Sequence, residues 1–536
     1  MPAPKLRALL RACASLLLLA GSHAAHAQDL REQVRESVEQ LRDAGPSGPR
    51  LEGVSLSEGI ARFYEQRDFA PAWNDRRLQE ALVTQLRGVA ADGLDPQDYA
   101  LARIEQGPAS ADSSALAAWD LMATRNYLLA LAHLFRGKVD PATLDAQWNF
   151  STRTMTPDEA LRYMVEAVRS GNIAGVFDGA RPTHPAYGRL RAALARLRAI
   201  EAAGGWPQIT GGKTLKPGMD DPRVAALRRR LAATGDLAAA DDNGSTLYDA
   251  TVEAAVQRFQ SEQYLTADGA IGAGTRNALN LPVEKRIGQL RANLERGRWL
   301  LHELHDDFLL VDIAGFQINL FRKGESVWSS RVQVGKAARS TPVFKSEITY
   351  LNLNPTWTVP PTILREDLLP KLRRDPRQLQ RLKLRVFDVN GQELAPEDID
   401  WNKPGRITLR QDAGAGNALG RAVIRFPNPY SVYLHDTPHQ ELFDASQRAF
   451  SSGCIRVENV LELVQLLLAD PAWDKAAIDT ALTDEQTRSL RLPQPLPILL
   501  AYWTVDVPEN GRVGFKADIY DRDTPLLKAL AEKPRL

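Results

Sequence analysis

The chain has 536 residues, of which 44% are hydrophobic and 25% are charged. This length exceeds what one hydrophobic core supports and the composition is ordinary, which excludes a disordered or fibrous chain and predicts two to four domains. Lys and Arg number 67 against 66 Asp and Glu. This balance argues against a nucleic-acid partner, because proteins that bind nucleic acids carry an excess of basic residues.

The N-terminus has the pattern of a secretory signal peptide over residues 1–27. A basic start that ends at Arg11 precedes an apolar stretch around Leu16 to Ala20, and an A-x-A cleavage site ends at Ala27. A membrane anchor is the alternative, but the apolar stretch is shorter than the roughly 20 residues that span a bilayer. Cys13 precedes the apolar stretch, so we do not expect it to carry a lipid. The pattern predicts an exported, periplasmic protein with no transmembrane segment in the mature chain.

Cleavage after Ala27 leaves Cys454 as the one cysteine of the mature chain. No internal disulfide can then form, although exported proteins often use them. Such a cysteine is a pairing partner, an inert buried thiol or a reactive nucleophile. Cleavage also removes three basic residues, which leaves a net charge of about −2.

Residues 28–210 contain mostly helical patterns, such as SEGIARFYEQR and SALAAWDLMATRNYLLALAHLF. Little in them suggests a site, so they predict a helical scaffold domain. The stretch GGWPQITGGKTLKPGMDDP, residues 204–222, is rich in turn-forming residues and indicates a linker.

Residues 215–282 have the pattern of a small three-helix domain, with Val224 and Leu227 on one apolar face and Val252 on another. The pattern FQxxxxLxxDGxxGxxTxxAL resembles the C-terminal half of the peptidoglycan-binding module of exported wall enzymes. The residues at the matching places are Phe259, Gln260, Asp268, Gly269, Gly272 and Thr275. The opening half matches less well, because DDNGSTLYDATVEAAV lengthens a loop. Binding of peptidoglycan is favoured, and a purely structural bundle remains the alternative.

Residues 284–536 form the third predicted domain. From Asp306 the sequence alternates with period two and is rich in β-branched and aromatic residues, which predicts an antiparallel meander. Residues 362–414 look like an insertion, with a helical stretch followed by turns. GRAVIRFPNPYSVYLHDTP then returns to a strand pattern, and ENVLELVQLLLAD predicts a helix.

Cys454 lies between Gly453 and this last helix. A helix N-terminus or a neighbouring histidine lowers the pKa of a thiol, and we expect the N-terminus of the helix to face Cys454. Gly453 lets the backbone approach a substrate closely. Backbone amides at such a turn can hold an oxyanion, which is worth about 3 kcal/mol for each amide in acyl transfer.

His435 is the candidate base. Strand alternation puts Ser431, Tyr433 and His435 on one face, and His435 ends the strand. A base on a rigid strand end that faces a nucleophile is the arrangement that acyl transfer needs. His439 lies in the following loop and ranks lower. On spacing alone, an inert cysteine and an unrelated surface histidine remain the alternative.

His435, fifteen intervening residues and then SSGCIRVEN resemble the signature of L,D-transpeptidases with the YkuD-type catalytic domain. The matching residues are His435, Ser451, Gly453, Cys454, Arg456 and Asn459. Ser452 departs from the many members that have histidine there, and it is typical of the long, YcbB-like subgroup. NALG at residues 417–420, Thr341-Pro342 and NPTWTVPP also resemble that subgroup. The order of signal peptide, scaffold, binding module and catalytic domain with an inserted cap recurs as well, so the resemblance spans essentially the whole mature chain.

The resemblance implies a cysteine acyltransferase that takes part in cell-wall biogenesis and cell shape. Cys454 would attack the carbonyl of the third stem residue of a peptidoglycan tetrapeptide, releasing D-alanine and forming a thioester. The side-chain amine of a second stem would resolve the thioester as a 3→3 cross-link. His435 would take the thiol proton and return one to the departing amine. The amides of Gly453 and Cys454, with the Tyr433 hydroxyl as a further donor, would hold the oxyanion.

The resemblance also implies substrate contacts. Ser452, Arg456, Asn459 and Trp357 are the candidates, although Arg456 and Asn459 could equally brace the loop and Trp357 could simply pack. The insertion would act as a lid that excludes water, which competes with the amine. No cofactor is required, because the bond broken supplies the energy for the bond made. No metal is indicated, because ligand spacing such as HExxH does not occur.

The expected partners are donor and acceptor peptidoglycan stems, and other wall-synthesis enzymes remain open. An L,D-carboxypeptidase, or a transferase that joins a stem to a protein lysine, would use the same residues. A non-catalytic wall-binding adaptor is disfavoured by the intact His435, Gly453 and Cys454. A general cysteine endopeptidase would have other residues around its cysteine. The predicted fold is therefore multidomain α+β, with a helical scaffold, a three-helix module and a β-rich catalytic domain that carries an inserted helical cap.

Overall fold

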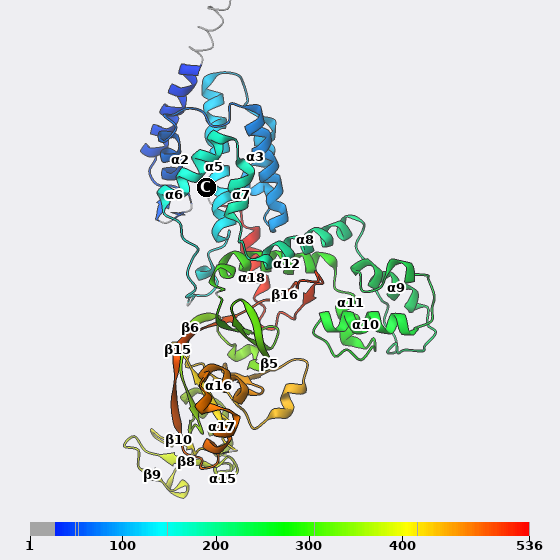
Figure 1. The fold of residues 1–536 in the computed structure, drawn as a ribbon, viewed down its shortest axis with the longest axis vertical. Helices are drawn as coiled ribbons and strands as arrows, with labels where there is room; N and C mark the ends of the chain where they lie inside the picture. Colours follow the sequence, from blue (N-terminus) through cyan, green and yellow to red (C-terminus); the bar gives the residue numbers. More distant parts are fainter. Residues whose placement is uncertain are drawn as a thin grey trace, which may run out of the picture.

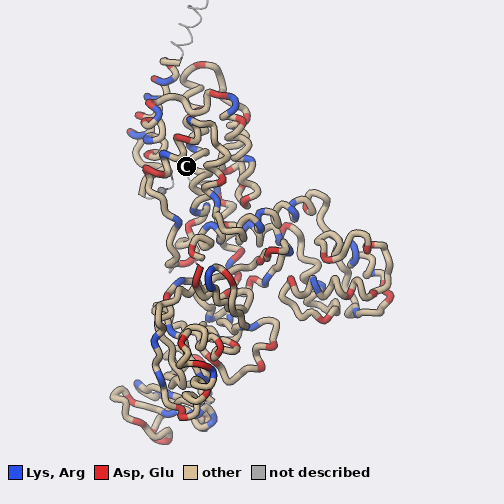
Figure 2. The backbone as a smooth tube through the Cα atoms, viewed as in Figure 1, with Lys and Arg blue, Asp and Glu red and all other residues tan. Residues whose placement is uncertain are grey.

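The computed structural model describes residues 27–534 except 49, 52, 147, 305 and 415. The predicted signal peptide therefore lies outside the described residues, apart from Ala27. Figure 1 shows a helical domain at one end of the molecule, a β-rich domain at the other and a small helical domain beside their junction. Basic and acidic residues are interspersed over all three parts (Figure 2). None of the described helices combines the length and the apolar character that a membrane crossing requires.

The helical domain is built around one long helix, α5 (Ser113–Arg136). The Asp112 side chain accepts a hydrogen bond from the amide of Ala115 at its start, and Gly137, with a φ of 100°, ends it. Apolar residues cover most sides of α5 because the surrounding helices bury it. The other elements are a helix over residues 27–43, β1 (Arg50–Leu51), β2 (Val54–Ser55), α2 (Leu56–Glu65), α3 (Arg76–Gly88), α4 (Leu101–Gln106), α6 (Pro157–Ser170), α7 (Ile173–Ala180) and α8 (Pro185–Ala202).

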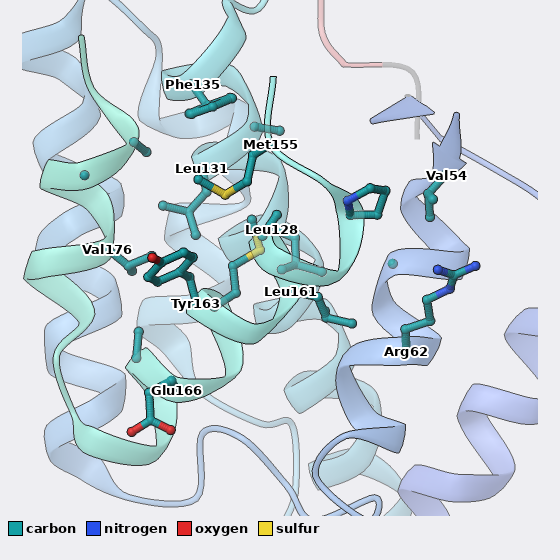
Figure 3. A pocket seen from close by; sticks show the side chains of 18 of the residues that line it. Val54, Arg62, Leu128, Leu131, Phe135, Met155, Leu161, Tyr163, Glu166 and Val176 are labelled. Atoms are coloured by element: carbon teal, nitrogen blue, oxygen red, sulfur yellow. The ribbon is translucent and has the colours of Figure 1, made fainter. Parts of the chain in front are cut away.

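A cavity of about 530 Å³ lies between α2, α5, α6 and α7 (Figure 3). Its lining is mostly apolar and includes Leu128, Leu131 and Met155, whereas the charged Arg62 and Glu166 lie at its periphery in the view of Figure 3. The lining contains none of the residues that the sequence predicts for a site.

The small helical domain has the three predicted helices, α9 (Arg223–Thr234), α10 (Ala250–Glu262) and α11 (Ala273–Leu279). The Gln260 side-chain amide donates to Asp268 Oδ1 at 2.9 Å and to Thr275 Oγ1 at 3.1 Å. Its carbonyl oxygen accepts the Gly269 amide at 2.9 Å, and Gly269 has a φ of +70°. These residues of the peptidoglycan-binding motif thus hold the turn between α10 and α11.

Helix α12 (Val283–Leu300) joins the domains. It packs against α8 and against the C-terminal helix α18 (Asp523–Ala531), which returns to this junction from the far end of the chain (Figure 1). The hairpin of β16 (Val505–Asp506) and β17 (Gly514–Phe515) belongs to the same apolar cluster as α8 and α12. The domain bounds drawn from the sequence stay a prediction, and the packing of α12 ties the third predicted domain closely to the first.

The β-rich domain contains a nine-stranded sheet whose order is β13-β5-β14-β12-β11-β6-β15-β3-β4. Strand β5 also pairs with β4, so eight of the strands form a closed ring around an apolar interior. The predicted meander is confirmed, because β3, β4 and β5 pair antiparallel in sequence order. The strands are β3 (Phe308–Asp312), β4 (Gln317–Arg322), β5 (Glu325–Gly335), β6 (Phe344–Leu353), β11 (Ala422–Arg425), β12 (Leu434–His435), β13 (Ala449–Ser451), β14 (Ile455–Val457) and β15 (Arg488–Ala501), and the helices are α16 (Val460–Leu468) and α17 (Lys475–Ala481).

The predicted insertion, residues 362–414, forms a small subdomain together with the residues from Trp357 onward, and its apolar core includes Leu372, Val386 and Leu409. The expectation of a helical cap was incomplete, because the insertion also contains a four-stranded sheet of order β7-β10-β8-β9. The short strands among turn residues hid this sheet from the sequence pattern. Its elements are β7 (Trp357–Thr358), α13 (Pro361–Ile363), the π-helical turn η7 (Leu364–Leu368), α14 (Leu369–Leu372), α15 (Gln378–Arg381), β8 (Leu384–Phe387), β9 (Glu393–Leu394) and β10 (Thr408–Gln411).

Candidate active site

Strands β12 and β14, together with the residue just before each strand, place four of the predicted residues on one face of the sheet. The two strands pair in parallel, with Leu434 opposite Ile455. Both of these side chains are fully buried in the apolar interior. Their neighbours along each strand therefore project from the opposite face, because side chains alternate along a strand. These neighbours are Tyr433, His435, Cys454 and Arg456.

His435 is buried and 5% exposed, and its ring is fixed at the end of β12. Nδ1 lies 2.5 Å from the carbonyl oxygen of Asp436. Because a carbonyl only accepts, Nδ1 carries the proton, and Nε2 is the nitrogen that can accept one. Burial, with a smaller effect from the nearby charge of Arg456, lowers the pKa of His435 to about 3, although the bond to Asp436 acts in the opposite direction. The imidazole is thus a neutral base at physiological pH.

Cys454 is partly exposed, and its Sγ lies 3.8 Å from the carbonyl oxygen of Ser431. Burial raises the pKa of the Cys454 thiol, although hydrogen bonds from Tyr433 and the charge of Arg456 act against this effect. The Tyr433 ring lies 5.6 Å from the His435 ring, centroid to centroid. A protonated thiol and a neutral imidazole therefore face one side of the sheet together, with a tyrosine beside both.

Two local expectations from the sequence were wrong. Strand β14 separates Cys454 from α16, so the helix N-terminus does not adjoin the thiol and gives no reason for a lowered pKa. Ser431 has a φ of 57° and lies outside β12, so strand alternation does not place it beside Tyr433 and His435. Instead, its backbone carbonyl contacts the thiol.

The loop before Cys454 is held by its own hydrogen bonds. Gly453 has a φ of +115°, a conformation that side chains other than glycine rarely adopt. Its amide donates to Ser451 Oγ at 3.1 Å, and Ser451 Oγ donates to the Cys454 carbonyl at 2.6 Å. The Gly453 amide is therefore already engaged, which weighs against its predicted part in holding an oxyanion. The Cys454 amide and the Tyr433 hydroxyl are the stronger candidates.

Ser452 is exposed and accepts a hydrogen bond from Arg339 at 3.0 Å. The same guanidinium forms ion pairs with Glu366 at 2.7 Å and with Asp367 at 2.5 Å. Both carboxylates belong to the π-helical turn of the inserted subdomain. Arg339 thus ties the insertion directly to the residue two positions before Cys454.

The other predicted substrate contacts have structural partners. Arg456 Nη1 donates to the buried Gln333 at 3.0 Å, whereas its buried Nε has no partner among the described residues. Asn459 precedes α16 with a φ of 56°, a conformation that asparagine tolerates well. Trp357 is partly buried against the core of the insertion. His439 lies in the loop after β12 with its side chain 62% exposed, in accord with its lower rank.

Sequence reasoning missed Arg339, Glu366 and Asp367, since nothing local marks a contact between segments so far apart. Thr341 was noted only as part of a dipeptide of the subgroup, although its hydroxyl donates to the Gly453 carbonyl at 2.9 Å. Within the described part of the chain, no cluster of three or more His, Cys, Asp or Glu residues could hold a metal ion.

The raised pKa of Cys454 predicts a distinctive pH dependence for alkylation by iodoacetamide. Only the thiolate reacts, so the rate should rise with pH, with a midpoint above the value of about 8.5 that is usual for cysteine. Intact-protein mass against time, from pH 5 to 10, measures this rate, and a short cysteine peptide is the reference. A rate that is already on a plateau at pH 6 would show a thiolate–imidazolium pair and would contradict the neutral pair described above.

Three regions of the chain match models of known protein families. Residues 306–478 match the YkuD family model, described as an L,D-transpeptidase catalytic domain. Residues 58–194 match a scaffold domain, and residues 220–279 match a domain described as "Putative peptidoglycan binding domain". The chain therefore contains a region that matches a YkuD-type L,D-transpeptidase catalytic domain together with regions that match scaffold and peptidoglycan-binding domains, and the resemblance found in the sequence is confirmed.

Among individual proteins, a "Putative L,D-transpeptidase" of Haemophilus influenzae (strain ATCC 51907 / DSM 11121 / KW20 / Rd) is 36% identical over 246 residues, which are 45% of this chain and 49% of that protein. The match thus spans about half the length of the curated relative. An L,D-transpeptidase structure from Mycobacterium smegmatis is 15% identical over 37% of this chain and 58% of that one, with a TM-score of 0.19. Another L,D-transpeptidase structure, from Xylanimonas cellulosilytica DSM 15894, is 14% identical. The match covers 55% of this chain and 99% of that one, with a TM-score of 0.17. Scores this low carry no argument about the fold.

Proposed function

We propose that this protein is a peptidoglycan L,D-transpeptidase that forms 3→3 cross-links through a thioester on Cys454. The observation that carries the proposal is the parallel pairing of β12 and β14, which sets Cys454 and His435 on one face within the region that matches the catalytic domain. Export to the periplasm and binding of the wall by residues 215–282 belong to the same proposal, as do the donor and acceptor stems as partners.

The first half of the reaction is acylation. His435 Nε2 takes the proton of the Cys454 thiol as Sγ attacks the carbonyl carbon of the third stem residue. The oxyanion is held by the Cys454 amide and the Tyr433 hydroxyl. When the tetrahedral intermediate collapses, the C–N bond to D-alanine breaks, and His435 gives its proton to the departing amine. The products are D-alanine and a thioester.

The second half returns the enzyme to its starting state. The side-chain amine of a second stem attacks the thioester carbonyl, and His435 takes a proton from that amine. The C–S bond then breaks, and His435 returns the proton to Sγ. The number of amide bonds is unchanged, so the reaction needs no external energy source. The neutral state of His435 suits this sequence, because the imidazole can accept a proton at the start of each half: from the thiol in the first and from the acceptor amine in the second.

The insertion serves as a lid that keeps water from the thioester, and Arg339 is its latch. Arg339→Ala removes both ion pairs to the insertion and the bond to Ser452. Exposed ion pairs are weak, so the ratio of hydrolysed tripeptide to cross-linked dimer should rise by no more than about fivefold. Chromatography of the products measures this ratio. Arg385→Ala is the matched control, since Arg385 pairs with Glu393 and Asp412 inside the insertion, and an equal rise in that variant would refute the latch.

Product analysis with a disaccharide-tetrapeptide tests the proposed function. A transpeptidase yields dimers and free D-alanine in equal amounts. Tripeptide without dimers would establish an L,D-carboxypeptidase instead. A stem attached to protein lysines would point to a stem-to-protein transferase, and binding without any product would leave a wall-binding adaptor.

A further inference from the structure

One loop, residues 335–341, holds all three residues that precede Cys454. The Lys336 amide donates to the carbonyl of Ser451 at 3.0 Å. Arg339 reaches the Ser452 hydroxyl, as described above. Thr341 Oγ1 donates to the carbonyl of Gly453 at 2.9 Å. The position of the Cys454 loop therefore depends on the position of residues 335–341.

This supporting loop is folded tightly on itself. The Gly335 amide donates to Thr341 Oγ1 at 2.9 Å, which joins the two ends of the loop. A Cβ atom at Gly335 would lie 2.2 Å from the carbonyl oxygen of Arg339, so no larger residue fits without a shift of the backbone. The loop therefore has little conformational freedom, and a displacement of it would also displace Gly453 and Cys454.

Tyr520 holds both ends of the supporting loop from behind. Its hydroxyl donates to the Gly335 carbonyl at 2.6 Å and accepts the Thr341 amide at 3.2 Å. Its ring stacks on Tyr502, with centroids 5.6 Å apart and an interplanar angle of 19°. The backbone amide of Tyr520 donates to the Tyr502 hydroxyl at 3.0 Å. The tyrosine is thus fixed through both its ring and its backbone.

The segment that carries Tyr520 is itself anchored to the junction helix α12. Asp523 forms an ion pair with Arg296 of α12 at 2.5 Å and accepts the Thr504 hydroxyl at 2.8 Å. Thr504 in turn accepts from Asn293 of α12 at 2.6 Å. A continuous set of contacts therefore runs from α12 through the C-terminal segment to the Cys454 loop.

We propose that Tyr520 is a positioning residue for the Cys454 loop, although it lies outside the region that matches the catalytic domain, residues 306–478. The proposal rests on the proposed function for the meaning of activity, but it concerns geometry that the thiol itself reports. Tyr520 keeps residues 335–341 in place, and they keep Gly453 and Cys454 in line with His435. Small displacements of reacting groups are costly, since about 1 Å can lower a rate by about 100-fold.

The test compares Tyr520→Phe with the parent protein, both as the full mature chain. The phenylalanine keeps the ring and removes only the hydroxyl, so kcat for cross-linking should fall about tenfold while KM stays unchanged. Loosening the loop also exposes the thiol to water. The pH midpoint of alkylation by iodoacetamide should therefore fall, since burial is the main reason that the pKa is raised. Tyr127→Phe is the matched control, because the Tyr127 hydroxyl donates to the backbone carbonyl of Met164 within the helical domain.

Thr341→Val is a second variant that removes a different hydroxyl from the same set of contacts. It should lower kcat as well, and the double variant should lose less than the product of the two single effects, because both hydroxyls act on one loop. Unchanged kcat and an unchanged alkylation midpoint in Tyr520→Phe would overturn the proposal. An equal loss of kcat in Tyr127→Phe would also overturn it. So would a loss of kcat in the double variant equal to the product of the two single losses. If the parent protein makes no cross-links but the alkylation midpoint still shifts in Tyr520→Phe, the positioning role stands and the proposed function is wrong.

Discussion

Cys454→Ala should abolish the acyl-enzyme and lower cross-linking by at least about 10⁴-fold, since removal of a nucleophile leaves only binding and oxyanion stabilisation. No other cysteine of the predicted mature chain can replace it. The variant should fold normally, because alanine keeps Cβ and removes only the weak hydrogen bonds of a thiol, which are those to Ser431 and Tyr433. The rate of D-alanine release measures the loss, and circular dichroism checks the fold. Release at more than about 1% of the parent rate would show that the reaction does not pass through the thiol.

His435→Asn should lower cross-linking by about 10² to 10⁴-fold, the usual contribution of a general base. Asparagine can still donate to the Asp436 carbonyl, as Nδ1 does now, but it has no counterpart of Nε2. The variant therefore keeps the local fold and loses only the proton acceptor. The steady-state rate measures the effect, and His439→Asn is the matched control because the His439 side chain is exposed. Equal losses in both variants would contradict the role of His435.

Alkylation separates this effect from damage to the cysteine. In His435→Asn the thiol should still react with iodoacetamide at high pH, because hydroxide then removes its proton. Loss of both alkylation and cross-linking would instead indicate that the loop had collapsed.

The neutral pair of Cys454 and His435 distinguishes this site from one with a preformed thiolate. Burial disfavours the charged form of both groups. It raises the pKa of the Cys454 thiol and lowers the pKa of the His435 imidazole. In the proposed mechanism, the proton would then move only when a substrate carbonyl is in place to be attacked. A site of this kind protects its thiol from oxidation between turnovers, because the thiolate is the reactive form.

Local patterns predicted much of the catalytic domain. The period-two alternation from Asp306 gave β3 to β5 their correct order. The motif around Cys454 predicted His435 as the base, and the structure pairs the strand of His435 with the strand that follows Cys454, while the role of the histidine stays a prediction. The strand order could be predicted because it depends on residues close together in the chain. The expected helix dipole failed for a local reason as well: β14 occupies the three residues Ile455–Val457 in front of α16, and so short a strand is not visible in the alternation.

The remaining contacts could not be predicted, because they join distant segments. Arg339 meets Asp367 across the insertion boundary, and Tyr520 meets Gly335 across 185 positions of the chain. Neither tyrosine nor arginine is unusual at these positions, and no periodicity marks them. The sheet of the insertion escaped prediction for a related reason, since strands of two to four residues carry too little alternation to stand out.

Intact-protein mass after mixing the mature chain with a disaccharide-tetrapeptide tests the central claim most directly. The proposed mechanism predicts an adduct on Cys454 equal to the substrate minus D-alanine, which disappears when a second stem is added and is absent from Cys454→Ala. A protein that binds the substrate and turns it over without any such adduct would contradict a thioester at Cys454.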